Sequence, residues 1–154
     1  MELKQVILRQ LEMSHQRVLR SLEELTEADV QQSPTGNLSP VVWQVGHLAW
    51  SESFYAGRAD GAVSVPPTFA ELFRSGTGGK GTYPPLAEVT SALGAAQEGL
   101  AEVARGTDLA KPVEGRSYST VGELLLFACF HRGYHYGKIA TLRALLGKPI
   151  VLRR

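Results

Sequence analysis

The chain has 154 residues, of which 44% are hydrophobic and 20% charged, and 16 Lys and Arg stand against 15 Asp and Glu. This length predicts one folded domain over residues 1–154, and the near-zero net charge disfavours both intrinsic disorder and a general nucleic-acid binder. The single cysteine, Cys129, excludes an intramolecular disulfide and a cysteine-rich zinc cluster.

The first half of the chain predicts two long helices joined by a loop. Apolar residues recur every three, four or seven positions between residues 2 and 25, which predicts an amphipathic helix. A loop rich in turn-forming residues follows over residues 26–39. Ser39 as a cap and Pro40 at the first helical position predict a second helix that runs to Gly57.

A long connection rich in Gly and Pro separates the second helix from the third. It covers residues 58–85, and residues 68–74 within it predict a short helix. Connections of this length are uncommon unless they cover part of the fold or cross one of its ends. The third long helix is predicted over residues 86–105, where one face is apolar.

The last long helix has clear signals at both ends. It begins at Ser119 or Thr120, and Thr120 with Glu123 fits a capping box. It ends at Leu146, and Gly147 suits the left-handed position that follows a helix. No alternating strand pattern is present, so the four amphipathic helices predict an all-α four-helix bundle, a fold that builds its sites from facing helices.

Three histidines are the most informative residues. His131 and His135 lie four positions apart, so both rings project from one face of the last helix and can hold one metal ion. The alternatives for this spacing are two polar residues at a surface or two satisfied core residues. The pair lies on the apolar stripe, where an imidazole without a partner is costly. His47, between Trp43 and Trp50, would complete a three-histidine site with open coordination positions.

The surroundings of the pair exclude two kinds of metal site. Arg132 follows His131 where a zinc peptidase of the His-Glu-x-x-His type needs Glu as its general base. The chain also lacks the paired Glu-x-x-His units of a di-iron bundle. A mononuclear site remains.

Charge is unevenly distributed along the chain. The segment from Leu124 to the end has no acid. The segment does contain basic residues. They either are cations near a helix C-terminus or create a positive field that attracts an anionic small molecule or an acidic partner. Only this feature would favour a DNA-binding role, so we do not expect a nucleic-acid partner. The segment's bases are Arg132, Lys138, Arg143, Lys148, Arg153 and Arg154.

Three motifs together resemble the DinB/YfiT-like superfamily over essentially the whole chain. They are Ser39-Pro40-x-x-Trp43-x-x-x-His47-Leu48, His131-x-x-x-His135-x-Gly137 and Leu146-Gly147-Lys148-Pro149. The resemblance implies an up-down-down-up four-helix bundle, often a homodimer, with a divalent metal ion (zinc, nickel or iron). The implied ligands are His47, His131 and His135. Relatives of known activity use the metal to activate a low-molecular-weight thiol, as bacillithiol S-transferases and mycothiol-dependent isomerases do.

Other side chains near the histidines have two readings each. In one reading Lys138 extends to the bundle edge or to a subunit interface. In the other it binds the carboxylate of a thiol cofactor or of an anionic substrate. The family more often has Gln at this position. Tyr134 either packs or bonds a substrate. We expect His15 in the core or lining a pocket rather than as a fourth ligand, and Cys129 as a small buried residue. Trp50 and Phe54 are also expected in the core.

The sequence therefore predicts a divalent-metal-dependent enzyme that acts on a small molecule. A thiol S-transferase, or a related transferase or hydrolase, fits because a metal ion deprotonates a coordinated thiol or water near neutral pH. The alternative is a non-catalytic helical dimer, with metal bound only for stability or not at all, that acts in protein interaction or stress response. No segment is long enough to span a bilayer, and we expect a cytoplasmic protein without a membrane partner.

Overall fold

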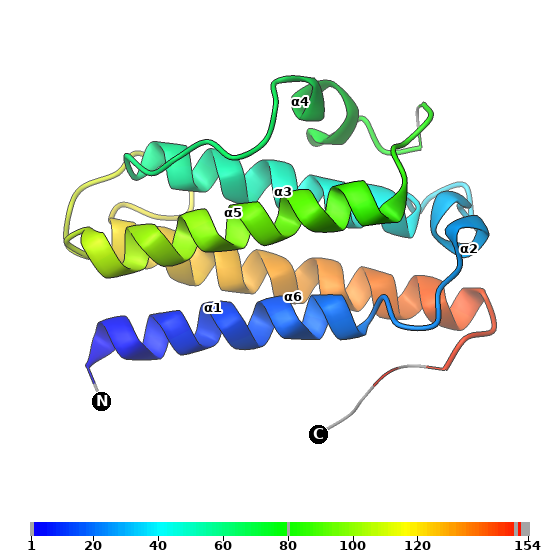
Figure 1. Cartoon of the computed structure of the whole chain (residues 1–154), viewed down its shortest axis with the longest axis horizontal. Helices are drawn as coiled ribbons and strands as arrows, with labels where there is room; N and C mark the ends of the chain where they lie inside the picture. The colour runs from blue at the N-terminus through cyan, green and yellow to red at the C-terminus, as the bar shows by residue number, and fades with distance from the viewer. Residues whose placement is uncertain (1, 80, 150, 152–154) are drawn as a thin grey trace.

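The computed structural model describes residues 2–79, 81–149 and 151. Within this part of the chain there are six α-helices and no strand, which confirms the all-α class. Four long helices lie side by side, and two short ones sit at their edges (Figure 1). The long helices are α1 (Leu3–Arg20), α3 (Val41–Arg58), α5 (Leu86–Gly106) and α6 (Val121–Leu145), and the short ones are α2 (Glu27–Gln31) and α4 (Thr68–Phe73).

The directions of the long helices decide which side chains can meet. In Figure 1, α1 and α6 run from left to right, whereas α3 and α5 run from right to left. α3 packs against α5 and α6, and α1 packs against the same two helices. α3 and α6 are therefore antiparallel neighbours, and the predicted metal ligands lie on these two helices.

The short helix α4 covers the outer side of α3, and the core continues beneath it. All residues from Val41 to Ala49 are buried, although only part of this helix faces the other long helices. Phe69 and Phe73 of α4 belong to the same apolar cluster as Val42 and Val45. The 58–85 connection thus covers part of the fold, as its length suggested.

The helix boundaries confirm some predictions and correct others. The capping box of Thr120 and Glu123 is present, and Gly147 has a φ of 71°. The first helix ends at Arg20 rather than at residue 25. The predicted 26–39 loop contains α2, which begins with a second capping box. At the start of α3 the N-cap is Pro40, one residue later than predicted, and no side chain caps it.

Of the bases after Leu124 that the structure describes, Arg132, Arg143 and Lys148 have partners inside the fold, whereas the ammonium of Lys138 lies over the Tyr134 ring. Arg132 is 1% exposed and makes a two-pronged ion pair with Glu52 of α3, with both N–O distances 2.6 Å. Arg143 donates to the carbonyl oxygens of Ser21 and Glu23. Lys148 forms an ion pair with Asp29 at 3.1 Å, and Arg153 and Arg154 lie outside the described residues.

The Arg132–Glu52 pair also ties the four long helices together. Arg132 donates to the side chain of Gln97 on α5 at 2.5 Å and to the carbonyl oxygen of Leu11 on α1 at 2.6 Å. A buried charge needs such a set of partners, because each unmet donor in a dry interior costs free energy. None of the described helices combines the length and hydropathy that a membrane crossing requires.

Candidate metal centre

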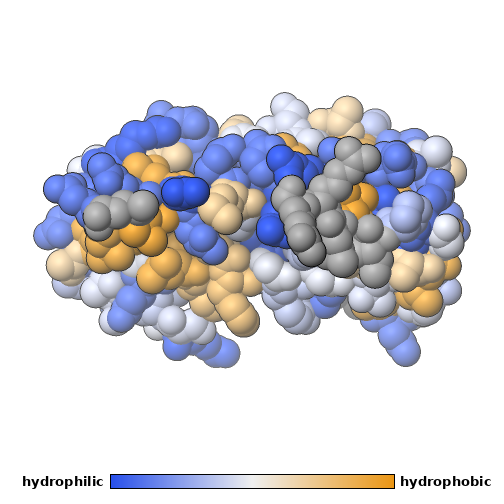
Figure 2. Space-filling view, turned by 90° about the horizontal axis from the view of Figure 1, so that it is seen from below, coloured by the Kyte–Doolittle hydropathy of each residue, from blue (hydrophilic) through white to orange (hydrophobic). Residues whose placement is uncertain are grey.

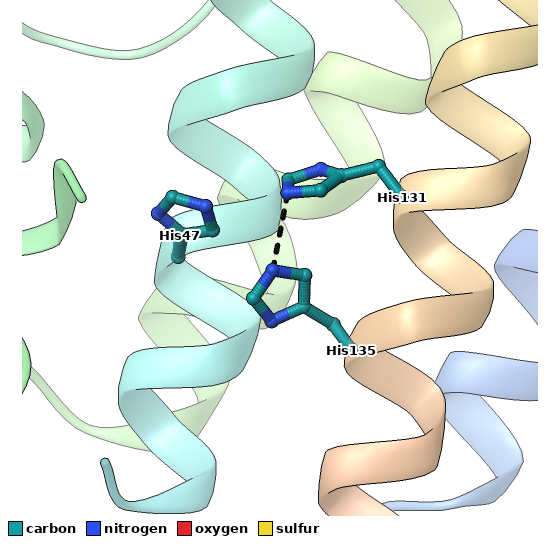
Figure 3. Close-up of side chains that lie close together, drawn as sticks. All are labelled: His47, His131 and His135. Carbon is teal, nitrogen blue, oxygen red and sulfur yellow. Dashed lines mark hydrogen bonds between the residues drawn. The ribbon is translucent and has the colours of Figure 1, made fainter. Parts of the chain in front are cut away.

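The three predicted histidines meet between α3 and α6. One ring nitrogen of each of His47, His131 and His135 lies within 4.8 Å of those of the other two. Figure 3 shows the two rings from α6 facing the single ring from α3. The Nε2 atoms of His131 and His135 are 3.1 Å apart. The structure thus brings together residues that are 84 positions apart (131 minus 47) in the chain.

Two of the rings are held by hydrogen bonds at Nδ1. His47 Nδ1 lies 2.6 Å from the carbonyl oxygen of Phe73, which can only accept, so Nδ1 carries the proton. His135 Nδ1 lies 2.7 Å from Oε1 of Gln44, whose own NH2 group donates to the carbonyl oxygen of Ser39 at 3.0 Å. Both neutral rings therefore present the Nε2 lone pair. Metal-ligating histidines typically donate their other N–H to a carbonyl in this way.

The third ring shows that this donor set suits a cation. His131 Nδ1 is buried and has no partner among the described residues. If the His131 proton is on Nε2, the Nδ1 lone pair of this ring stays buried and unpaired. If the proton is on Nδ1, the Nε2 lone pairs of His131 and His135 face each other at 3.1 Å. A divalent cation held by the three rings would remove the lone-pair contact, so these residues fit a metal ion.

The electrostatics favour the metal-binding form of the imidazoles. Burial, assisted by the neighbouring rings and Lys138, lowers the pKa of His131 to about 4 and that of His135 to about 2. Burial also lowers the pKa of His47. All three rings are therefore neutral at pH 7, and neutral imidazole is the form that ligates metals.

Aromatic side chains surround the cluster. Trp43 stacks on His47, with ring centroids 4.8 Å apart and planes 15° apart. Phe127 lies nearly parallel to His131 at 6.2 Å, and Tyr55 meets that ring edge-on at 6.1 Å. Trp43 Nε1 donates to the carbonyl oxygen of Leu72, which ties the 58–85 connection to the site. These contacts restrict the rings and keep bulk water from their faces.

Lys138 and Tyr134 lie beside the cluster on α6. The Lys138 ammonium is 4.4 Å from the centre of the Tyr134 ring, and the Tyr134 ring meets His135 edge-on at 5.1 Å. Tyr134 is 54% exposed. Tyr134 therefore packs on a candidate ligand while keeping half of its surface open to solvent.

His15 and Cys129 lie outside the cluster, as predicted. His15 is buried on α1, and burial, with the nearby Arg132 charge, lowers its pKa to about 4. Cys129 is buried, and burial raises the pKa of its thiol. A raised thiol pKa is typical of an inert structural cysteine.

Sequence reasoning missed two residues of the site and misplaced Phe54. Gln44 lies three positions before His47, on the same helix face, so its spacing was a usable signal. The carbonyl of Phe73 left no signal, because any residue type carries that acceptor. Trp50 and Phe54 were expected in the core. Trp50 is partly buried and packs against the main apolar cluster, whereas Phe54 is 45% exposed, and both line a surface hollow.

The comparisons with known proteins agree with this geometry. No curated protein matches the sequence. The family model of the DinB superfamily matches residues 10–139, a range that contains His47, His131 and His135 and all of the helix–helix contacts around them. Since this range is most of the chain, the all-helical protein with a three-histidine cluster belongs to the DinB superfamily.

Proposed function

We propose that the protein is a divalent-metal-dependent enzyme, with His47, His131 and His135 as the ligands. One observation carries this proposal: three neutral imidazoles converge, those of His47 and His135 buried and that of His131 partly buried. The two buried rings are oriented by hydrogen bonds at the opposite ring nitrogen. A site with only three protein ligands leaves coordination positions for water or substrate, which is typical of catalytic rather than structural sites.

The reaction class we favour is transfer to or from a low-molecular-weight thiol such as bacillithiol or mycothiol, or a related transfer or hydrolysis. A bound zinc, nickel or iron ion would supply the Lewis acidity that makes a thiol or water nucleophilic at neutral pH. The aromatic rings of Trp43, Phe127 and Tyr55 limit the water around the reacting atoms, which strengthens electrostatic interactions there.

Lys138 and Tyr134 are the side chains that we propose for substrate positioning. The ammonium of Lys138 is close enough to contribute to the lowered pKa of all three histidines. A positive charge beside the cluster suits the carboxylate of a thiol cofactor or an anionic substrate. The half-exposed Tyr134 hydroxyl would donate to the same ligand.

The proposal includes the family's up-down-down-up bundle and a homodimer. The helix directions in Figure 1 support the first part. For the second, hydrophobic side chains gather on the face of α1 and α6 near the beginning of both helices (Figure 2). A patch of this kind marks an interaction surface, and we propose a second copy as the occupant. The exposed residues of this patch include Leu3, Val6, Met13, Leu126 and Phe130.

A non-catalytic, metal-stabilised dimer acting in protein interaction or stress response is the second candidate. Burial favours it, because His47 and His135 are only 5% and 2% exposed. A metal held so deeply would stabilise the antiparallel packing of α3 on α6. This candidate predicts metal content without turnover.

Metal content and turnover of the untagged protein test both candidates. We expect about one divalent ion per chain, retained in His15→Ala and lost in His47→Ala. A content below about 0.2 per chain, with no change in His47→Ala, would refute the metal site. The metal-loaded protein is then offered bacillithiol, mycothiol or glutathione with a generic electrophile. Metal-dependent consumption of the electrophile supports the enzyme, and its absence with every thiol favours the stable dimer.

A further inference from the structure

Four side chains form a continuous row along one side of α3, from the buried His47 to the exposed Arg58. His47, Trp50, Phe54 and Arg58 are spaced three, four and four positions apart, which places them on one side of a helix. Trp50 lies 5.7 Å from His47, Phe54 stacks on Trp50 at 6.1 Å, and the Arg58 guanidinium lies 5.5 Å from the centre of the Phe54 ring. The row leads from a candidate metal ligand to a cation.

A hollow of about 330 Å³ is lined on one side by Trp50, Phe54 and Arg58 of this row. Its second wall is apolar and comes from the 58–85 connection, through Val63, Pro66, Pro67 and Ala70. That wall is anchored to α3, because Ser53 Oγ accepts hydrogen bonds from the backbone N–H groups of residues 64 and 65 at 2.8 and 3.3 Å. Volumes of this order are typical of small-molecule sites.

Among the described residues, Arg58 is the only charged one that lines the hollow. One of its N–H groups donates to the carbonyl oxygen of Glu114, and within the described chain it forms no ion pair with a carboxylate. A guanidinium carries five donors, so several stay available at the end of the hollow. Such a fork matches a carboxylate, which can accept two of these hydrogen bonds at once.

We propose that this hollow binds an elongated apolar carboxylate. The carboxylate pairs with Arg58, the apolar part lies on Phe54 and Trp50, and the other end of the molecule points toward His47, which lies next to Trp50. Arg58 follows His47 by eleven positions (58 minus 47), which is about 16 Å along a helix axis. Only the placement of the reacting end rests on the proposed function; recognition of the acid depends on the hollow and Arg58.

The chemistry of the two walls discriminates among ligands. A neutral apolar molecule of the same length gains the apolar burial but leaves Arg58 without its partner. A small anion such as acetate reaches the guanidinium but buries little surface. Both features are therefore needed for tight binding, which makes this hollow selective for an organic acid with a long apolar part.

Calorimetric titration with octanoate and with 1-octanol tests this inference on the full-length protein, as purified and after treatment with a chelator. We expect octanoate to bind more tightly than octanol. Arg58→Met should weaken octanoate binding at least about tenfold and leave octanol binding unchanged. Arg9→Met, on the exposed surface of α1, is the matched control and should change neither. Ala70→Leu, which fills the hollow, should weaken both ligands.

The results separate this inference from the metal proposal. Octanoate affinity equal to that of octanol, or unaffected by Arg58→Met, overturns the inference whatever the metal content. Charge-dependent octanoate binding to a protein without metal supports the inference although the proposed function fails. Thermal unfolding of each variant without ligand shows that it is folded, so a loss of binding reports on the hollow.

Discussion

Replacing Gly46 by alanine should damage both the stability of α3 and the metal centre. Gly46 lies under the ring of Phe73, and a Cβ at this position would overlap that ring. Phe73 is fully buried and packs on Phe69 at 5.1 Å and on Tyr83 at 5.8 Å, so its ring has no free space to enter. The ring can move only with its backbone, and that backbone carries the carbonyl that accepts from His47.

The size of the effect follows from two opposing contributions. Adding a methyl group to a filled core costs roughly 1–3 kcal/mol, whereas Gly→Ala inside a helix gains about 1 kcal/mol. Displacing the Phe73 carbonyl adds about 1 kcal/mol for the hydrogen bond to His47. We therefore expect Gly46→Ala to lower the free energy of unfolding by about 1–3 kcal/mol. Metal affinity should fall about 10–100-fold, as it does when a ligand's orienting partner is lost.

Urea unfolding with a chelator present measures the stability change, and competition with a metal-binding dye measures affinity. Gly94→Ala is the matched control, because a Cβ at this helical position meets nothing within 4 Å. It should raise the free energy of unfolding by about 0.5–1 kcal/mol and leave metal affinity unchanged. If Gly46→Ala behaves like Gly94→Ala in both assays, the proposed coupling between α4 and His47 is wrong.

Four further substitutions test the buried polar groups and the helix caps. Glu52→Gln leaves the buried Arg132 charge without its ion pair and should lower the free energy of urea unfolding by about 3–5 kcal/mol; a loss under about 1 kcal/mol would contradict the buried pair. His15 has a folded-state pKa of about 4 against 6.5 in the unfolded chain, so unfolding takes up a proton between these pH values. The free energy of unfolding is therefore unaffected by His15 above pH 6.5 and falls by up to about 3 kcal/mol as the pH drops to 4. His15→Leu should remove that part of the pH dependence in chelator-treated protein. Thr120→Ala should lower the free energy of unfolding by about 1 kcal/mol because Thr120 caps α6. Ser39→Ala should lower it less, because the Ser39 side chain does not cap α3. Equal losses would contradict the observed cap positions.

Much of the fold and the ligand set was predictable from the sequence, because both depend on local patterns. The 3.6-residue period of apolar residues predicted the long helices, and local capping signals predicted where α6 begins and ends. The spacing of His131 and His135 predicted that their rings share one face. His47 stood out only because it interrupts an apolar stretch, and the family motif supported its role.

Tertiary structure alone decided how the site is held and where some helices end. α1 stops at Arg20, and the carbonyl oxygens of Ser21 and Glu23 accept hydrogen bonds from Arg143, more than a hundred positions away. The carbonyl that orients His47 comes from a residue 26 positions later, and the partner of Arg132 is 80 positions earlier. A helical pattern specifies which face of a helix is buried, but it carries no information about which distant group will meet that face, since that depends on the packing of the whole chain.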